Sequence, residues 1–557
     1  MPSTVGAYLA TRLEQLGLTH HFVVPGDYNL LLLDQLLANP RLTQVGCCNE
    51  LNAAYAAEGY ARARGAAALV VTYNVGAFSA LNGVAGAYAE HLPVLLISGG
   101  PNTNDRGAGH RLHHTLGTEH LHYQYEIFRQ VTCEAVQIAH AQDAPHLIDR
   151  AIAAALREQR PAYIEIPCNL AAAPCAAPSP FATLRPLRRS DPGALDAAVA
   201  AAAALLAAAA KPLLLAGPRL RPAGAGAAFA RLAEALGCAV AVMPSAKGMF
   251  PEDHPQFIGV AWGPVSSPGC GEVVDWADLV LAAGPLWTDY STVGWTAQPR
   301  PQRTIDAEIG RVRLPDADLS GVELAEFLVA LAARVAPRPA TLTQFARVRP
   351  PPAAVTVAAA AAPLTRAELA RQVEAELDGR TTLVVETGDS WFNGMYAALP
   401  TGGGFEIEMQ WGSIGWSVPA TLGLALGLGP QRRVVTMVGD GSFQLTAQEV
   451  STLIRARLPA LLLLINNGGY TIEVEIHDGP YNRIKNWDYA GLIDVFNAAD
   501  GAGLGLRARS GGELAAALVR ARDHQGGPVL IECLLDRDDC SRQLLEWGRK
   551  VADANAR

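Results

Sequence analysis

The chain has 557 residues, half of them hydrophobic and 17% charged, which is enough apolar material for about three or four packed domains and too much for a disordered protein. A single small binding module is therefore excluded. The 44 basic and 53 acidic side chains give a formal net charge of −9, and the Lys and Arg residues form no cluster, so we expect no nucleic-acid partner.

Nothing in the sequence indicates a membrane or export segment. The longest apolar run, Ala197–Ala210, has 14 residues, whereas a helix needs roughly 20 to span a bilayer. The start of the chain, Met1–Thr4, lacks the charged and apolar parts of a signal peptide. The nine cysteines include no CxxC pair, which favours free thiols over disulfides or a zinc site. We therefore expect a cytoplasmic protein with no membrane partner.

Helical and strand patterns alternate from the start of the chain. The helical patterns are Thr4–Leu16, Leu30–Leu37, a helix capped by Asn49 that runs to Arg64, and Gly76–Glu90. The strand patterns between them are His20–Val24, Val45–Cys48, Ala68–Thr72 and Val94–Ser98. This alternation predicts a parallel sheet with helices on both faces.

Two stretches rich in Pro and Ala interrupt the alternation and are predicted to be linkers, Ala171–Pro192 and Pro337–Pro363. The strand patterns after the first linker are Pro212–Ala216, Ala239–Met243 and Leu279–Ala283, and those after the second are Leu383–Glu386, Arg433–Val438, Leu461–Ile465 and Val529–Leu534. We therefore predict an α/β protein of three domains, over residues 1–180, 190–340 and 360–557, each a mostly parallel sheet flanked by helices.

The strongest motif lies in the third domain. The strand Arg433–Val438 leads into Gly439-Asp440-Gly441-Ser442, a helix is predicted at about Leu445–Arg455, and the next strand ends at Asn466-Asn467-Gly468-Gly469-Tyr470. A right-handed crossover places these two loops side by side at the edge where α/β sheets bind ligands.

The chemistry of the two loops suits a cation and a diphosphate. Asp440, Asn467 and the backbone carbonyl of Gly469 are hard oxygen ligands of the kind that Mg²⁺ prefers. The amides of Gly441 and Ser442 are placed to bind diphosphate oxygens. On its own, Gly-Asp-Gly is equally consistent with a simple turn, but with the Asn-Asn loop at this separation it resembles the thiamine diphosphate motif of a large enzyme family.

Further segments carry the resemblance along the chain: Pro25–Asn29, Asn49–Asn52, Ala57–Arg62, Thr72–Gly76, His110–His114, Asp289–Ser291, Glu386–Trp391, Glu408–Trp416 and Tyr470–Gly479. Over essentially its whole length the sequence resembles the bacterial pyruvate decarboxylases, a group of thiamine diphosphate-dependent 2-oxo acid decarboxylases. The resemblance implies a pyrimidine-binding N-terminal domain, a middle domain and a C-terminal domain that binds diphosphate and Mg²⁺. It also implies a homotetramer, a dimer of dimers with active sites between subunits.

The resemblance assigns cofactor contacts. Glu50, which by itself is equally a partner of its helix dipole, bonds the aminopyrimidine ring. Ile414, by itself a core residue, is the wedge that bends the cofactor, and the carbonyl of Gly412 accepts a hydrogen bond from it. The remaining implied cofactor contacts are Thr387, Gly388, Asp389, Ser390 and Tyr470. Gly468 departs from relatives that carry a larger residue there, which bears on the stiffness of the loop.

The resemblance also assigns proton transfer. Adjacent histidines point different ways in regular structure, so His113 and His114 alone are weak evidence of a site. Together with Asp27 they match the family's relay set, and histidine is the usual group for proton transfer near neutral pH. Glu473 matches a carboxyl over the cofactor that promotes decarboxylation and protonation, whereas Glu475 is expected to face solvent.

The implied substrate pocket favours a small 2-oxo acid. Its positions are Tyr290, Thr387, Trp391, Ile472 and Ile476. All but Thr387 are bulky and leave room for little beyond a methyl group, so pyruvate is favoured. The implied reaction is non-oxidative decarboxylation of pyruvate to acetaldehyde and CO₂ through a thiamine diphosphate enamine.

Three other interpretations stay open. The first is a decarboxylase of larger 2-oxo acids. The second is a carboligase resembling acetolactate synthase, against which the His113-His114 pair speaks, because protonation competes with carbon–carbon bond formation. The third is a thiamine diphosphate binder without catalytic activity, which requires a missing catalytic residue, and none is missing from the matched motifs.

Overall fold

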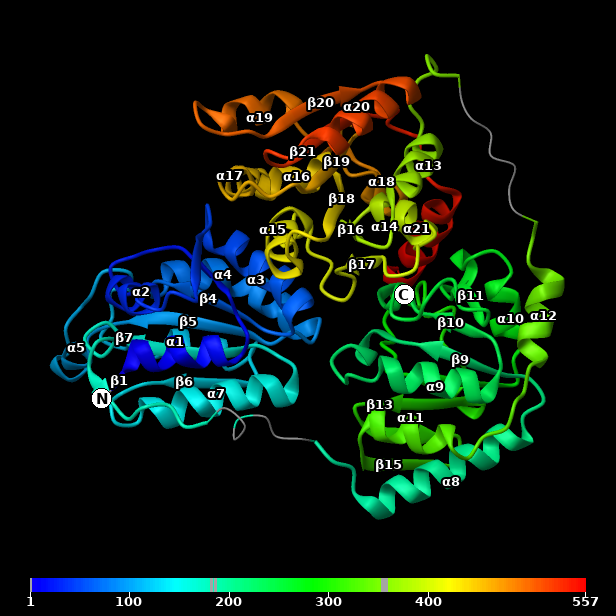
Figure 1. Ribbon diagram of the computed structural model, residues 1–557, viewed down its shortest axis with the longest axis horizontal. Helices are drawn as coiled ribbons and strands as arrows, with labels where there is room; N and C mark the ends of the chain where they lie inside the picture. Colours follow the sequence, from blue (N-terminus) through cyan, green and yellow to red (C-terminus); the bar gives the residue numbers. More distant parts are fainter. Residues whose placement is uncertain (1–2, 181–183, 185–187, 352–358, 557) are drawn as a thin grey trace.

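The computed structural model describes residues 3–180, 184, 188–351 and 359–556. Figure 1 shows three α/β units, the N-terminal one in blue and cyan, the middle one in green, and the C-terminal one in yellow to red above both. Within these residues, no helix combines the length and the apolar character needed to cross a membrane. Parts of both predicted linkers, 181–183, 185–187 and 352–358, lie outside the described residues.

The N-terminal domain is built on a six-stranded, fully parallel sheet. Its strands in spatial order are β3 (Thr43–Gly46), β2 (His20–Val23), β4 (Ala67–Val71), β5 (Val94–Gly100), β7 (Ala162–Pro167) and β6 (Glu134–Gln137). Its helices are α1 (Val5–Gln15), α2 (Leu30–Leu37), α3 (Glu50–Arg64), α4 (Val75–Ala89), α5 (Thr103–Ala108), α6 (Tyr123–Phe128) and α7 (Ala144–Glu158). A small antiparallel pair joins β1 (Ser3–Thr4) to β8 (Pro174–Cys175).

The middle domain has a seven-stranded mixed sheet. Its strands in spatial order are β11 (Phe257–Val260), β10 (Val240–Val242), β9 (Pro212–Ala216), β12 (Leu279–Ala283), β13 (Thr304–Glu308), β14 (Gly310–Leu314) and β15 (Ala317–Val322). The pairs among the first five are parallel, and β14 and β15 extend one edge as an antiparallel hairpin. The helices are α8 (Pro192–Ala208), α9 (Gly226–Leu236), α10 (Cys270–Trp276), α11 (Leu324–Ala332) and α12 (Ala340–Val348).

The C-terminal domain again has a fully parallel sheet of six strands. Their spatial order is β17 (Gly404–Ile407), β16 (Thr381–Val385), β18 (Arg433–Gly439), β19 (Leu461–Asn466), β21 (Val529–Leu534) and β20 (Leu504–Ala508). The helices are α13 (Arg366–Glu376), α14 (Asp389–Met395), α15 (Ser417–Leu428), α16 (Asp440–Thr446), α17 (Val450–Arg455), α18 (Thr471–Ile476), α19 (Tyr489–Asn497), α20 (Gly511–Asp523) and α21 (Arg542–Asn555). The predicted three-domain α/β fold with mostly parallel sheets is confirmed.

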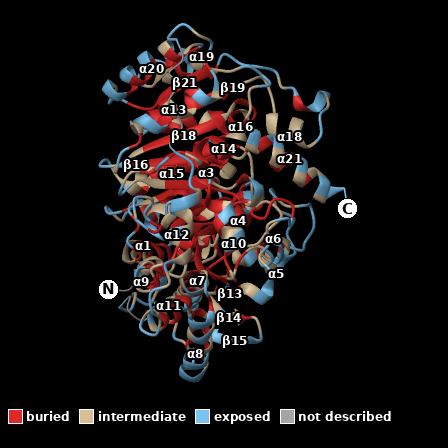
Figure 2. Ribbon diagram, turned by 90° about the vertical axis from the view of Figure 1, so that its right-hand side faces the viewer, coloured by how far each residue is buried: buried red, intermediate tan, exposed pale blue. Residues whose placement is uncertain are grey.

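Buried apolar strands explain why these sheets form. Runs such as Leu461–Ile465 have almost no exposed surface, as expected for a parallel sheet covered on both faces. Figure 2 shows the buried residues concentrated on the central strands and on α3 and α15, whereas α8 and α20 carry exposed residues at the two ends of the molecule.

Helices α3 and α15 join the N-terminal and C-terminal domains, side by side in both views. Small residues allow their backbones to touch. A Cβ atom on Gly59 would lie 2.2 Å from the carbonyl oxygen of Ala420, and one on Gly423 would lie 1.8 Å from that of Ala56. Any larger side chain at either glycine would force the two helices apart.

Several predicted boundaries were wrong. The predicted linker Pro337–Pro363 contains helix α12, and the strand expected at Leu383–Glu386 is Thr381–Val385. The helix expected from Leu445 begins at Asp440 and is divided by a 3₁₀ turn, Ala447–Glu449, where the hydroxyl of Thr446 donates to the carbonyl of Gly415 at 2.7 Å. The strand expected at Val45–Cys48 is Thr43–Gly46, because its register with β2 ends at Gly46. The Cys48 amide then donates to Glu449 at 3.1 Å, across the junction of the two domains.

Candidate active site

A cavity of about 220 Å³ opens at the carboxyl ends of the parallel strands in the C-terminal domain. Its lining comes from the C-terminal domain, with one residue of the middle domain, Tyr290. The predicted site residues that line it are Tyr290, Thr387, Gly388, Asp389, Ser390, Gly412, Ile414, Gly441, Ser442, Asn467, Gly469, Tyr470, Ile472, Glu473 and Ile476. Lining residues as far apart in sequence as Tyr290 and Ile476, a separation of 186 residues, therefore meet at one cavity.

The two loops of the strongest motif lie side by side because β18 pairs with β19 in parallel. Asp440, the first residue of α16, is buried, and its carboxylate accepts hydrogen bonds from the amides of Gly441 at 2.7 Å and Gly468 at 2.6 Å. Burial raises the pKa of Asp440 to about 6, against the lowering effect of these backbone N–H groups. Asp440 itself does not line the cavity, although both neighbours, Gly439 and Gly441, do.

Backbone shape explains two glycines of these loops. Gly468 has φ of +79°, in the left-handed region where glycine has no steric penalty, and this conformation lets its amide reach Asp440. A Cβ atom on Gly441 would lie 2.4 Å from the ring of Tyr470, so only glycine lets that ring close over the loop. The residue expected to affect loop stiffness is thus the one that links the two loops.

Two buried oxygens on the wall of the cavity have no hydrogen-bond partner in the part of the chain that the structure describes. They are Oγ1 of Thr387 and Oδ1 of Asp389. The other carboxylate oxygen of Asp389 accepts from the side chain of Asn393 at 3.1 Å, and burial raises the pKa of Asp389 to about 6. Buried polar atoms are normally satisfied, so this wall is built to contact a polar ligand.

A loop after β17 carries Gly412 and Ile414 to the opposite wall. The amide of Ser413, between them, donates to Oε2 of Glu408 at 2.8 Å, and its hydroxyl lies 2.6 Å from that of Tyr55 on α3. The loop is therefore held from both the N-terminal and the C-terminal domain.

The apolar end of the cavity is formed by Tyr290, Ile472 and Ile476. Trp391, which we expected to face the substrate, does not line the cavity. It is fully buried behind Tyr290, with ring centroids 5.8 Å apart, because α14 turns this side chain into the core. Trp547 of α21 also packs edge-on against Tyr290 at 4.9 Å, so Trp391 and Trp547 support the pocket wall from behind.

Helix α18 presents two glutamates differently from each other. Glu473 is exposed and lines the cavity. Glu475, expected to face solvent, is half-buried against Gly548 of α21, and burial together with the nearby Asp538 raises its pKa. The correction follows from α21 packing on α18, a contact that local sequence pattern does not reveal.

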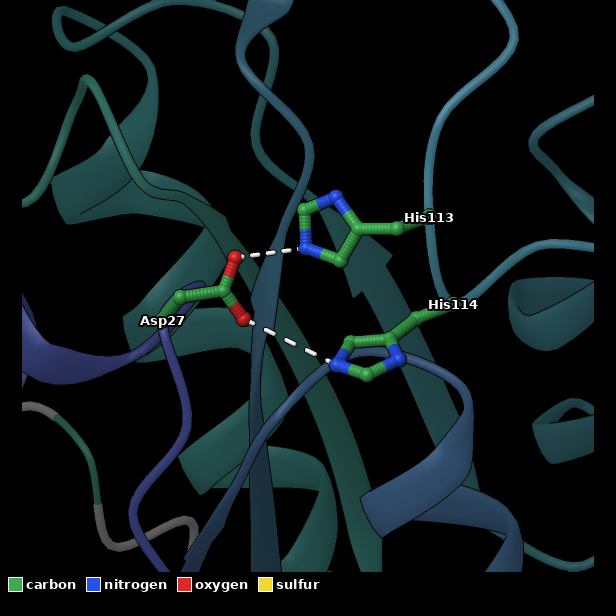
Figure 3. A group of neighbouring side chains, drawn as sticks. All are labelled: Asp27, His113 and His114. Atoms are coloured by element: carbon green, nitrogen blue, oxygen red, sulfur yellow. Dashed lines mark hydrogen bonds and ion pairs between the residues drawn. The ribbon is translucent and has the colours of Figure 1, made fainter.

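Asp27, His113 and His114 converge in the N-terminal domain (Figure 3). Nε2 of His113 lies 2.6 Å from one carboxylate oxygen of Asp27, and Nε2 of His114 lies 3.8 Å from the other. His114 has φ of +58°, which is why two adjacent side chains reach the same carboxylate. The side-chain amide of Asn74 donates through Nδ2 to the His114 carbonyl at 2.6 Å and holds that conformation.

Glu50 is the first residue of α3, as the Asn49 cap predicts. Its side chain is half-buried next to Gly76, whose missing Cβ would lie 3.0 Å from the Glu50 carboxylate. Glu50, Asp27, His113 and His114 all belong to the N-terminal domain, and none of them lines the cavity of the same chain. One chain thus presents two separate halves of the predicted site.

Sequence reasoning missed three lining residues, Gly439, Ile465 and Thr471. Gly439 ends β18, Ile465 lies near the end of β19, and Thr471 begins α18, so each is directly beside a residue of the motifs that were assigned to the site. That adjacency could have identified them from the sequence.

Comparison with known proteins gives the family context. Descriptions of thiamine pyrophosphate enzymes match three parts of the chain: the N-terminal TPP binding domain at residues 3–127, the central domain at 199–328 and the C-terminal TPP binding domain at 387–533. A pyruvate decarboxylase of Neurospora crassa is 55% identical over 555 residues, covering 100% of this chain and 97% of the relative.

Two further relatives have similar coverage. A probable pyruvate decarboxylase of Schizosaccharomyces pombe is 52% identical over 556 residues, covering 100% of this chain and 97% of the relative. Pyruvate decarboxylase 3 of Arabidopsis thaliana is 47% identical over 561 residues, covering 100% and 94%. These relatives are fungal and plant proteins, so the narrower resemblance to bacterial enzymes is not supported.

Proposed function

This chain belongs to the thiamine pyrophosphate enzyme family, and on that premise we propose that it catalyses the non-oxidative decarboxylation of pyruvate to acetaldehyde and CO₂. The observation that carries the proposal is the cavity, which gathers the cation and diphosphate motif, the unpartnered polar wall and a tight apolar end. Full-length relatives that are pyruvate decarboxylases support the same reaction.

The residues of the cavity fit thiamine diphosphate, the same compound as thiamine pyrophosphate. Asn467 and the Gly469 carbonyl on the cavity wall would hold Mg²⁺ together with Asp440, which lies between the lining residues Gly439 and Gly441. The amides of Ser442 and Gly441 would bind the diphosphate, with the Gly441 amide exchanging its hydrogen bond to Asp440 for one to a diphosphate oxygen. The unpartnered oxygens of Thr387 and Asp389 supply further polar contacts. When bound, the cofactor supplies the carbon nucleophile and the electron sink for loss of the carboxylate.

Gly412 and Ile414 form the other cofactor wall in this proposal. The Gly412 carbonyl would accept a hydrogen bond from the aminopyrimidine group, and the Ile414 side chain would support the ring. Gly388, Ser390 and Tyr470 complete the cofactor contacts. Their role is to fix orientation, because a reaction between held groups avoids the entropy cost of bringing them together.

Proton transfer would need groups from both the N-terminal domain and the cavity of the C-terminal domain. Glu50 holds a proton at the aminopyrimidine ring, and Asp27 with His113 and His114 moves protons to and from the reacting carbon and the departing aldehyde. Glu473, on the cavity side of α18, acts next to the substrate carboxylate. These roles require the N-terminal residues to lie next to a cavity of the C-terminal domain.

We infer that they meet between two copies of the chain, in a homodimer that pairs again into a tetramer. Both halves carry exposed apolar side chains that a partner would cover: Val75 at 49% and Leu116 at 74% exposure in the N-terminal domain, and Trp411 at 43% beside the cavity. Large apolar side chains exposed on both halves are available to an association surface. The partner's N-terminal half would then complete each cavity.

The bulky side chains at the apolar end support pyruvate over larger 2-oxo acids. Tyr290, Ile472 and Ile476 line the cavity there and would restrict the room for a substrate side chain larger than methyl. A pocket excludes oversized groups by steric clash, whereas it discriminates weakly against groups that are too small.

We also infer a cytoplasmic location. All nine cysteines are free, and Cys238, Cys270 and Cys533 are buried in cores, as expected for a protein kept in a reducing compartment.

The test is aldehyde formation by protein stripped of cofactor and then supplied with thiamine diphosphate and Mg²⁺. Acetaldehyde from pyruvate with little phenylacetaldehyde from phenylpyruvate supports the proposal. Preference for phenylpyruvate indicates a decarboxylase of larger substrates, acetolactate as the main product indicates a carboligase, and cofactor binding without any product indicates a binder without catalytic activity.

Sharing of the site between two copies has its own test. A Glu50→Gln chain and a Glu473→Gln chain are each expected to be nearly inactive. When they are mixed and allowed to exchange subunits, about a quarter of the sites should regain both intact halves, because half the dimers are mixed and one of their two sites is complete. No recovery after verified exchange would contradict shared sites.

A further inference from the structure

A cluster of charged side chains is buried where the N-terminal and C-terminal domains meet. Arg62 of α3 lies within it, with its guanidinium 2.7 Å from Glu58 and 3.4 Å from Glu90 at the end of α4. It also lies 3.3 Å from Glu406 of β17. Glu408, just after β17, is fully buried beside these groups and forms no ion pair within the described part of the chain.

The cluster contains more acidic than basic side chains. Its four carboxylates are Glu58, Glu90, Glu406 and Glu408, and its two guanidinium groups are Arg62 and Arg221. Arg221, from the middle domain, binds both oxygens of Glu406 at 2.8 and 2.9 Å, so its charge is already matched. The remaining carboxylates share Arg62 alone. Since an unpaired buried charge is costly, the cluster is expected to hold a proton at neutral pH.

Glu408 is the carboxyl best placed to hold that proton. Its Oε2 accepts the Ser413 amide at 2.8 Å, whereas its Oε1 has no hydrogen-bond partner among the described residues. Around Oε1 lie Gly86, where an added Cβ would come within 2.9 Å, and the ring of Trp411. A bare charge on Oε1 would face an apolar helix and an indole ring, which disfavours the ionised form.

The direction of the pKa shift of Glu408 agrees with its buried, partly unpaired position. Burial, followed by repulsion from Glu58 and Glu90, raises the pKa of Glu408 well above its usual range. Burial also raises the pKa of Glu58 to about 7. The charged groups that face Glu408 from the packed elements are Glu58 and Arg62 of α3, Glu90 at the end of α4, and Glu406 of β17.

We propose that neutral Glu408 is a positioning residue for the cofactor, which holds the Ser413 amide and thereby the Gly412 carbonyl and the Ile414 side chain on the cavity wall. The inference rests on the proposed function, because it concerns the wall assigned to the aminopyrimidine ring. Glu408 does not line the cavity and acts only through the loop that it anchors.

The consequence is a specific pH dependence. When Glu408 ionises, a second negative charge appears beside Glu58 in a dry site, and the loop must move or the cluster must open to water. Affinity for thiamine diphosphate should therefore fall as pH rises through the pKa of Glu408, by up to tenfold for each pH unit. A carboxyl that served only to fill space would give no such link between pH and cofactor affinity.

The experiment compares wild type, Glu408→Gln and Glu408→Ala as full-length proteins. Glutamine keeps an oxygen for the Ser413 amide and cannot ionise, whereas alanine leaves that amide without its buried acceptor. Glu449→Gln is the matched control, since Glu449 is also fully buried, accepts the Cys48 amide through Oε2 and has an Oε1 without a partner among the described residues. Its hydrogen bonds among the described residues go to Cys48 and Asn52, and none reaches the loop that carries Gly412.

The measurement is the Kd for thiamine diphosphate at saturating Mg²⁺ from pH 6 to 9, read from quenching of tryptophan fluorescence, together with kcat and KM for pyruvate. Wild type and Glu449→Gln should lose affinity as pH rises. Glu408→Gln should match wild type at low pH and keep its affinity at high pH. Glu408→Ala cannot ionise either, so its affinity should also stay constant with pH, at about one tenth of that of Glu408→Gln, the usual effect of leaving a buried N–H without an acceptor.

Two results would overturn the inference: a Glu408→Gln curve that follows wild type across the range, or Glu408→Ala binding as tightly as Glu408→Gln. If Glu408→Ala does not fold, the comparison of Glu408→Gln with Glu449→Gln still decides. Failure of the proposed function is seen separately, because then wild type with bound cofactor releases no acetaldehyde, while the binding curves remain measurable.

Discussion

The amide of Gly468 donates a hydrogen bond of 2.6 Å to the carboxylate of Asp440, and this bond ties together the two loops that form the base of the cavity. Gly468 reaches Asp440 only with φ of +79°. An alanine there meets no neighbouring atom within 4 Å, so its effect acts through the backbone alone.

Gly468→Ala should therefore lower the free energy of unfolding by about 1 kcal/mol, the cost of a left-handed conformation for a residue with a Cβ atom. Affinity for Mg²⁺ with thiamine diphosphate should weaken as well, because the strained loop carries Asn467. Chemical denaturation and cofactor titration measure both effects. Gly226→Ala is the control, since that glycine also has free space around it and lacks positive φ. Equal stability of the two variants would contradict the backbone argument.

Asp27→Asn should reduce kcat for acetaldehyde formation about a hundredfold or more, the usual contribution of a positioned proton-transfer group. The reason is that Asp27 lies 2.6 Å from His113 and orients its ring. Affinity for thiamine diphosphate should not change, because Asp27 is assigned to proton transfer and to no contact with the cofactor. Steady-state kinetics and cofactor titration separate the two effects, and a parallel loss of cofactor binding would show that Asp27 has a structural role instead.

The structure changes which substitution should widen the substrate pocket. Ile476→Ala removes a side chain that lines the apolar end, so the ratio of kcat/KM for phenylpyruvate to that for pyruvate should rise. Trp391→Ala instead empties a buried site behind Tyr290 and should cost about 3 to 5 kcal/mol of stability. A substrate panel and thermal melts distinguish them. The assignment of the pocket fails if Ile476→Ala leaves the ratio unchanged.

Glu386 should make stability depend on pH. Its carboxyl is fully buried next to Thr387 and accepts the Ser417 amide at 3.0 Å, and burial raises its pKa to about 7. Because this folded pKa lies above the ordinary value of 4.5, the stabilising proton is fully present below pH 4.5 and is lost as pH rises to about 7.

The free energy of unfolding of wild type should consequently carry a contribution that declines by roughly 3 kcal/mol between pH 4.5 and 7. Glu386→Gln should lack that part of the slope, whatever its absolute stability. Urea denaturation of the two proteins at a series of pH values gives the difference. Parallel curves would mean that Glu386 keeps an ordinary pKa in the folded protein.

The sequence predicted the fold class and the two loops of the cation and diphosphate motif for a physical reason, whereas the other residues of the cavity were implied by the family resemblance. Buried parallel strands are continuous apolar runs, and their carboxyl ends carry the polar motifs, so Asp440 and Asn467 were placed together by strand order alone. The starts of helices such as α3 were equally accessible, since the Asn49 cap marks the boundary locally.

The errors share a different cause, which is contact between segments distant in sequence. Glu475 looked solvent-facing, but α21 covers it from more than 60 residues away. Trp391 looked like a pocket residue, but Trp547 and Tyr290 enclose it. The convergence of His113 and His114 likewise depends on the positive φ of His114, which neither composition nor periodicity encodes.

The contact of α3 with α15, backbone against backbone at Gly59 and Gly423, leaves no room for a hinge between the N-terminal and C-terminal domains of one chain. If the active site needs both halves, a lone subunit cannot assemble it by closing on itself. Activity should then depend on protein concentration. Dilution of the protein below the dissociation constant of the dimer would abolish turnover. When the protein is concentrated again, activity would return with second-order kinetics in enzyme, even with cofactor in excess throughout.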